Sequence, residues 1–66
     1  MNERIAIDPR IHFGKPTITG TRITVENVLE LVCDGVTFTE IIENCYPELT
    51  PEDIQACIQY AMDVVA

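Results

Sequence analysis

A chain of 66 residues is long enough for one domain, and a hydrophobic content of 47% supports a small core but no membrane-spanning segment. All four cations lie in the first 22 residues, whereas residues 23–66 carry nine acids and no cation, so the formal net charge of −7 comes from the C-terminal two thirds. An acidic body repels phosphate, which argues against non-specific nucleic-acid binding by that part of the chain.

The N-terminal residues predict a short β ribbon. Residues 5–7 alternate like a strand, and residues 11–13 continue the alternation after Asp8-Pro9. The inward-facing positions of this ribbon are expected to be Ile5, Ile7, Ile11 and Phe13. Because an isolated two-stranded ribbon is marginal in water, it must pack on the helices or on a second copy, and we expect a homodimer or higher homo-oligomer whose contact includes it.

Residues 14–22, Gly-Lys-Pro-Thr-Ile-Thr-Gly-Thr-Arg, predict a loop of defined shape. Pro16 favours an extended backbone at Lys15, and Gly20 permits the positive φ of a tight turn after Thr19. The segment has no nucleophile beside a base, no carboxylate pair and no phosphate-loop spacing. We therefore expect it to contact a partner, and we expect His12, the only histidine, to be structural.

Three helices are predicted in the remainder of the chain. The first runs from Val25 to about Asp34 with Thr24 as N-cap, and Gly35 supplies a left-handed C-terminal residue. The second begins after Thr37, with Glu40 completing a capping box, and stops at Tyr46-Pro47. The inner face of the first helix is expected to hold Val25, Val28, Leu29 and Val32, and that of the second Phe38, Ile41, Ile42 and Cys45.

The third predicted helix has the clearest periodicity. Thr50 is its expected cap, Pro51 its first residue, and Glu52 and Asp53 lie at the positive end of its dipole. Its apolar stripe is Ile54, Cys57, Ile58, Ala61, Met62 and Val65, in which Met62 is expected to fill core space. The sequence thus predicts a mainly α single domain over residues 1–66: a β ribbon and loop at 1–22, then a three-helix helix-turn-helix bundle at 23–66.

Enzymatic and metal-binding functions are not favoured. The three cysteines, Cys33, Cys45 and Cys57, have no metal-site spacing, and on or beside apolar stripes they are interpreted as small buried hydrophobic residues of a reduced, cytoplasmic protein. Nothing basic lies near them in sequence to activate a thiol. We expect no cofactor, no small-molecule substrate and no pocket of ordinary ligand size.

A helix-turn-helix bundle can read DNA, and this alternative stays open. The third helix would present Gln55 and Gln59 to adenine edges, while Arg4 and Arg10 would hold phosphate. The outward face of that helix is otherwise acidic, so a solvated polar face is favoured over a reading face. Tyr60 at its edge is a candidate anchor of a protein interface.

Several motifs together resemble the domain-of-unknown-function family 433. They are Ile7-Asp8-Pro9, Gly14-Lys15-Pro16, Ile18, Gly20-Thr21-Arg22-Ile23, Val25, Gly35, Ile41-Ile42, Tyr46-Pro47, Leu49-Thr50 and Asp53-Ile54, and they cover nearly the whole chain. The resemblance implies a homeodomain-like three-helix fold with an N-terminal β segment. It also implies a role, held by some members, as antitoxin partner of small PIN-like ribonucleases.

The favoured functional hypothesis is therefore a non-enzymatic protein-binding module of antitoxin type, and the alternative is a DNA-binding transcription regulator. The expected partner contacts are Lys15, Arg22 and Tyr60. Arg22 is the best candidate for an acidic partner, because a guanidinium pairs bidentately with a carboxylate. The competing interpretation is that Arg22 only bridges to an acid of its own domain, such as Glu26.

Overall fold

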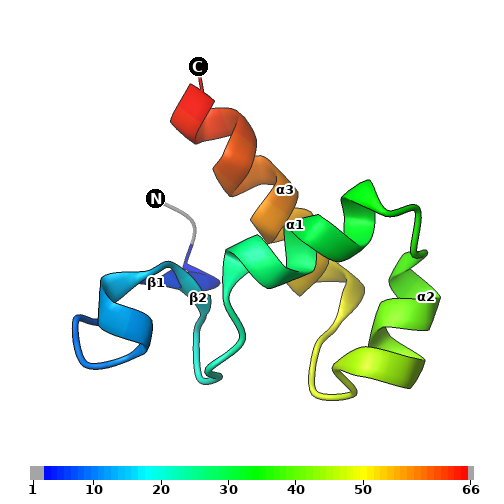
Figure 1. The fold of residues 1–66 in the computed structure, drawn as a ribbon, viewed down its shortest axis with the longest axis horizontal. Coiled ribbons are helices and arrows are strands. Elements are labelled where there is room, and N and C mark those ends of the chain that lie inside the picture. The colour runs from blue at the N-terminus through cyan, green and yellow to red at the C-terminus, as the bar shows by residue number, and fades with distance from the viewer. Residues whose placement is uncertain (1–2, 66) are drawn as a thin grey trace.

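The fold is a helical body with a small β ribbon at its N-terminal end (Figure 1). The computed structural model describes residues 3–65. In chain order its elements are β1 (Ile5–Ala6), the 3-10 turn η1 (His12–Gly14), β2 (Thr17–Ile18), α1 (Val25–Cys33), α2 (Phe38–Glu40), the π-helical turn η2 (Ile41–Cys45) and α3 (Pro51–Val65). This mainly helical arrangement with an N-terminal β segment confirms the fold class predicted from the sequence.

The predicted β ribbon is present, but its second strand lies later in the sequence than predicted. β1 pairs antiparallel with β2, with Ile5 opposite Ile18 and Ala6 opposite Thr17. The Thr19 N–H extends the ladder by donating to the Arg4 carbonyl at 2.8 Å. A strand at residues 11–13 was therefore the wrong assignment, and the loop between the two strands is longer than the sequence pattern indicated.

Residues 12–14 cannot form a strand because their backbone is left-handed. The φ angles are 50° at His12, 57° at Phe13 and 87° at Gly14. The chain has already turned before them, since the Ile11 N–H donates to the Asp8 carbonyl and the Asp8 carboxylate accepts from the Arg10 N–H, both at 2.9 Å. Phe13 is consequently 101% exposed, so its predicted inward orientation is wrong.

Ile7 also departs from the predicted alternation, because β1 ends at Ala6 and Ile7 is 49% exposed. The inward position that the ribbon does use is Ile5, which is buried together with Ile18 of the opposite strand. The ribbon therefore contributes one buried pair to the core and leaves the apolar residues of its connecting loop outside.

The core lies where α1, η2 and α3 meet the ribbon. Val28, Ile41, Ile54 and Cys57 are completely buried. Around them the cluster includes Ile5, Ile18, Ile23, Val25, Leu49 and Ala56. At about 25 cal/mol per Å² of apolar surface, burial of these side chains is the main force that holds α1 against α3.

The predicted helix caps are present. Thr24 Oγ1 accepts from the Asn27 N–H at 3.1 Å, and Thr37 Oγ1 accepts from the Glu40 N–H at 3.2 Å. The second helix has only three α-helical residues before it widens into η2, where the Tyr46 N–H donates to the Ile41 carbonyl at 2.7 Å. It ends before Pro47, as predicted.

The third helix follows the predicted bounds but extends beyond the core, and Figure 1 shows its last turns projecting away from the other elements. Met62 is 55% and Val65 84% exposed, whereas Ala56 is 4% exposed. The prediction that Met62 fills core space is therefore wrong. No helix within residues 3–65 has the length and apolar character needed to cross a membrane.

The cysteines do not share one environment. Cys57 is buried in the core, and burial raises the pKa of its thiol to about 11. Cys33 and Cys45 are exposed, which corrects the interpretation of all three as buried hydrophobic residues. They are the last residues of α1 and η2 respectively.

Candidate functional site

The loop of residues 14–22, which carries Lys15 and Arg22, has a fixed shape. Lys15 is extended, with φ −67° and ψ 144°, and Gly20 has φ 82°, as the sequence predicted. The turn is closed by the Thr21 N–H, which donates to the Ile18 carbonyl at 3.0 Å, and the Thr21 hydroxyl donates to the same carbonyl at 2.9 Å. This pattern, with the positive φ at the third turn residue, is a type II turn.

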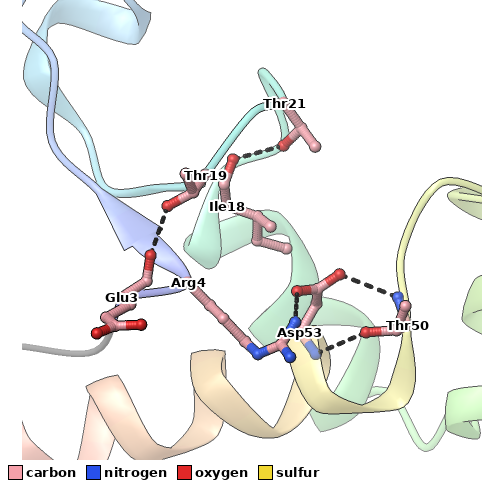
Figure 2. A network of polar contacts seen from close by, with 7 residues as sticks. All are labelled: Glu3, Arg4, Ile18, Thr19, Thr21, Thr50 and Asp53. Carbon is pink, nitrogen blue, oxygen red and sulfur yellow. Dashed lines mark hydrogen bonds and ion pairs between the residues drawn. The ribbon is translucent and has the colours of Figure 1, made fainter.

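Two contacts fasten the loop to the rest of the ribbon. The Thr19 hydroxyl donates to the Glu3 carbonyl at 2.9 Å, as Figure 2 shows. On the other side, His12 Nε2 lies 2.8 Å from the Arg22 carbonyl and donates to it. His12 therefore has a structural role, because it fixes the backbone at the end of the loop.

Three of the four cations are engaged within the domain. Arg4 contacts Asp53 at 2.9 Å, Arg10 contacts Asp8 at 2.9 Å, and Lys15 Nζ contacts Glu26 at 3.3 Å. Arg22 is exposed, and within residues 3–65 its guanidinium makes no such ion pair. Glu26, the proposed intramolecular partner of Arg22, is bound by Lys15 instead.

The Asp8–Arg10 pair is local and exposed. Hydrogen bonds from the Arg10 side chain and then from its N–H lower the pKa of the Asp8 carboxyl. The same side-chain contact raises the pKa of Arg10. The two charges therefore stabilise the turn before Phe13, and Arg10 has less capacity to hold a phosphate than an unpaired arginine would.

A groove of about 650 Å³ opens between α1 and the projecting end of α3, and we call it the α1/α3 groove. Its lining residues are Lys15, Pro16, Val25, Glu26, Leu29, Glu30, Cys33, Asp34, Tyr60, Ala61, Val64 and Val65. This volume lies in the range of ligand sites, so the expectation that so short a chain would have no pocket of that size is wrong.

Two of the three predicted partner-binding residues line the α1/α3 groove. Lys15 comes from the loop and Tyr60 from α3, and both line it, whereas Arg22 does not. Its apolar surface includes Val64, which is 64% exposed, and Val65. Glu30 and Asp34 give it an acidic edge that, within residues 3–65, no basic side chain neutralises.

The predicted DNA-contacting residues are less well assembled. Gln55 and Gln59 are exposed on α3, but the Gln59 amide donates to Asp63 Oδ1 at 2.9 Å. Arg4 reaches the first turn of this helix through Asp53, whereas Arg10 is paired in the ribbon loop. The structure thus brings one of the two predicted phosphate contacts to the helix that would read bases.

Phe13 and Val64 are the candidate contact residues that sequence reasoning missed. Periodicity assigned Phe13 to a strand, and Val64 lies outside the predicted apolar stripe of the third helix, so neither was considered as a contact residue. The turn-forming Asp8-Pro9 and the glycine at position 14 are the signals that could have placed Phe13 at a loop tip. Within the described residues 3–65, no group of three His, Cys, Asp or Glu side chains could hold a metal ion.

Comparison with known proteins gives one match. The family described as "Protein of unknown function (DUF433)" matches residues 5–61, which include the ribbon, the loop, α1 and most of α3. Neither the curated proteins nor the solved structures provide a match. Because the family match covers most of the chain, the protein belongs to the DUF433 family.

Proposed function

We propose that this protein is a non-enzymatic protein-binding module of the cytoplasm that acts as the antitoxin partner of a PIN-like ribonuclease. The antitoxin role is what resemblance to the family implies for some members. The observation that carries the proposal for this chain is Arg22, an exposed arginine on a fixed backbone whose guanidinium has no ion pair within residues 3–65.

Arg22 has the properties of a contact residue for an acidic surface. Its carbonyl is held by His12 and the turn before it is closed by Thr21, so little backbone entropy is lost on binding. A nuclease that holds metal through clustered carboxylates would offer such a surface, and an arginine fork can bind a carboxylate through two parallel hydrogen bonds.

The test is calorimetric titration of the full chain against a PIN-like ribonuclease encoded by a neighbouring gene. Arg22→Ala should weaken binding by about 2 kcal/mol or more, with an unchanged melting temperature, because a desolvated charge pair is lost at the interface. Arg10→Ala is the matched control: it removes the same charge from the same ribbon, but from a side chain already paired with Asp8. Unchanged affinity for Arg22→Ala would exclude Arg22 from the contact.

A DNA-binding transcription regulator is the weaker alternative. Of the two predicted base-reading side chains, Gln59 is hydrogen-bonded to Asp63, whereas Gln55 makes no hydrogen bond to another side chain within residues 3–65. The acidic residues of α3 oppose phosphate, and the cations that would offset them are paired. If DNA is bound, its affinity should fall steeply with salt and depend on the N-terminal cations instead of Gln55 or Gln59.

A further inference from the structure

Two unpartnered apolar features of the surface differ in shape. One is a protrusion: Phe13 is 101% exposed at the tip of the loop, and we call residues 10–15 with this side chain the Phe13 knob. The other is the α1/α3 groove, whose wall includes the exposed Val64 and Val65. An aromatic protrusion and an apolar groove are the two halves of a typical protein contact.

Hydrogen bonds around the Phe13 knob keep it exposed, although its backbone is strained. A bulky residue at φ 57° is an outlier, and His12 beside it has φ 50°. The Gly14 N–H donates to the Ile11 carbonyl at 3.1 Å, and His12 Nε2 donates to the Arg22 carbonyl at 2.8 Å. These hydrogen bonds give the loop tip a defined conformation. Strain that displays a fully exposed phenylalanine points to a binding role.

The knob and the groove are complementary in charge. Arg10 and Lys15 of the knob are paired with Asp8 and Glu26 at the surface, and residues 8–15, with two cations and one acid, have a formal charge of +1. The groove carries Glu30 and Asp34 beyond its Lys15–Glu26 pair. A second copy of this chain would therefore bring a cationic aromatic tip to an acidic apolar groove, which favours association in this orientation.

The two features are also adjacent on one molecule. Lys15 and Glu26 line the α1/α3 groove on one side and, on the other, a smaller hollow that includes His12 and Phe13. A two-fold axis near this ion pair would place the knob of each copy over the groove of the other. Such an isologous pairing buries the knob and the groove of both copies and limits the assembly to a dimer.

We propose that the protein is a homodimer in which the Phe13 side chain of each copy occupies the α1/α3 groove of the other. The groove volume of about 650 Å³ accommodates an aromatic side chain together with flanking residues. The contact goes beyond the proposed antitoxin function, since it assigns the groove to a second copy and leaves the Arg22 guanidinium for another partner.

Light scattering and sedimentation of the full chain test this arrangement by complementation. Phe13→Asn removes the knob and keeps a residue that tolerates a left-handed backbone, and Val64→Glu places a charge in the groove. The dimer of each variant alone should have a dissociation constant at least about 30-fold higher than that of the unmodified chain, as expected for loss of an interface hot spot. An equimolar mixture should form heterodimers, because the knob of one variant still fits the groove of the other.

Matched controls separate this contact from general effects. Met62→Glu adds the same charge two residues before Val64, at an exposed position that does not line the groove, and should leave the dimer intact. Arg22→Ala should also leave it intact, so failure of the dimer and failure of the nuclease contact are distinguishable. Circular dichroism of all variants should retain the helical signal, because every replaced side chain is exposed.

Thiol reactivity supplies an independent readout. Cys33 lines the groove, whereas the exposed Cys45 lines a different hollow beside Tyr46. At concentrations that favour the dimer, alkylation of Cys33 should slow several-fold while that of Cys45 stays constant. A monomer at 100 micromolar, heterodimers no more stable than the single variants, or equal alkylation of Cys33 at all concentrations would each overturn the proposal.

Discussion

Arg4 and Asp53, which are 49 positions apart in the sequence, form an ion pair of 2.9 Å between the start of the ribbon and the first turn of α3 (Figure 2). The Asp53 side chain also accepts from the Thr50 N–H at 3.0 Å, while Thr50 Oγ1 accepts from the Asp53 N–H at 3.3 Å. One carboxylate therefore caps a helix and fastens the N-terminal segment to it.

The two functions of Asp53 predict unequal effects of substitution. Asp53→Ala removes the carboxylate half of the reciprocal cap together with the ion pair and should lower the free energy of unfolding by about 1–2 kcal/mol. Arg4→Gln removes only a half-exposed pairing partner and should have an effect below about 1 kcal/mol. Urea unfolding of both variants measures the difference. An equal loss in the two variants would show that the cap contributes nothing.

Acid should weaken the same contact. Burial opposes ionisation of Asp53, but hydrogen bonds from Thr50 and Arg4 outweigh it, so the pKa of this carboxyl is lowered in the folded state. The unfolded chain then binds the proton more tightly, and the resulting stability is present above about pH 4 and is lost as the pH falls through the folded pKa. Unfolding of the unmodified chain between pH 5 and pH 2 should show this loss. Asp53→Asn should show a flatter profile over the same range.

Local sequence signals predicted the helices well. Thr24, Thr37 and Thr50 are caps because each places a hydroxyl where the first N–H groups of a helix need an acceptor, and that arrangement depends on three or four neighbouring residues. Gly20 and Gly35 have the positive φ angles expected of them for the same reason. Features of this kind can be predicted without knowledge of what packs against them.

Periodicity failed where the core ends or the chain turns. A stripe along α3 does not show how many of its turns find a partner, and the last turn of this 15-residue helix, with Val64 and Val65 exposed, extends beyond the core. Met62 is exposed for that reason. The meeting of Lys15 and Tyr60 in the α1/α3 groove depends on tertiary packing, so it could not be predicted from the order of residues.

The strain at Phe13 leads to a stability prediction that is separate from its role in association. Phe13→Asn should raise the free energy of unfolding of the monomer by about 0.5–1 kcal/mol, because asparagine tolerates φ 57° better and the exposed ring makes no core contact. The measurement is thermal unfolding at a protein concentration low enough to keep both proteins monomeric. Phe13→Ala, which retains a Cβ without the polar group, should gain less. A loss of stability in Phe13→Asn would mean that the ring packs on the domain.

The buried thiol of Cys57 predicts a loss of stability at alkaline pH. Burial, and then the nearby charge of Asp53, raises the pKa of this thiol to about 11, whereas in the unfolded chain it ionises near pH 9. Between these values the unfolded state has lost a proton that the folded state keeps, so stability is complete below pH 9 and declines as the pH rises toward 11.

The expected decline from pH 8.5 to pH 10.5 is about 2 kcal/mol in the free energy of unfolding, measured with urea. Cys57→Ala is the control: it should be less stable than the unmodified chain at pH 8.5, because it leaves a small cavity in the core, but it should lose about 2 kcal/mol less over the same pH interval. Cys33 is exposed and lies outside the core, so Cys33→Ala should keep the full decline. Identical pH profiles for Cys57→Ala and the unmodified chain would assign the alkaline loss to other groups.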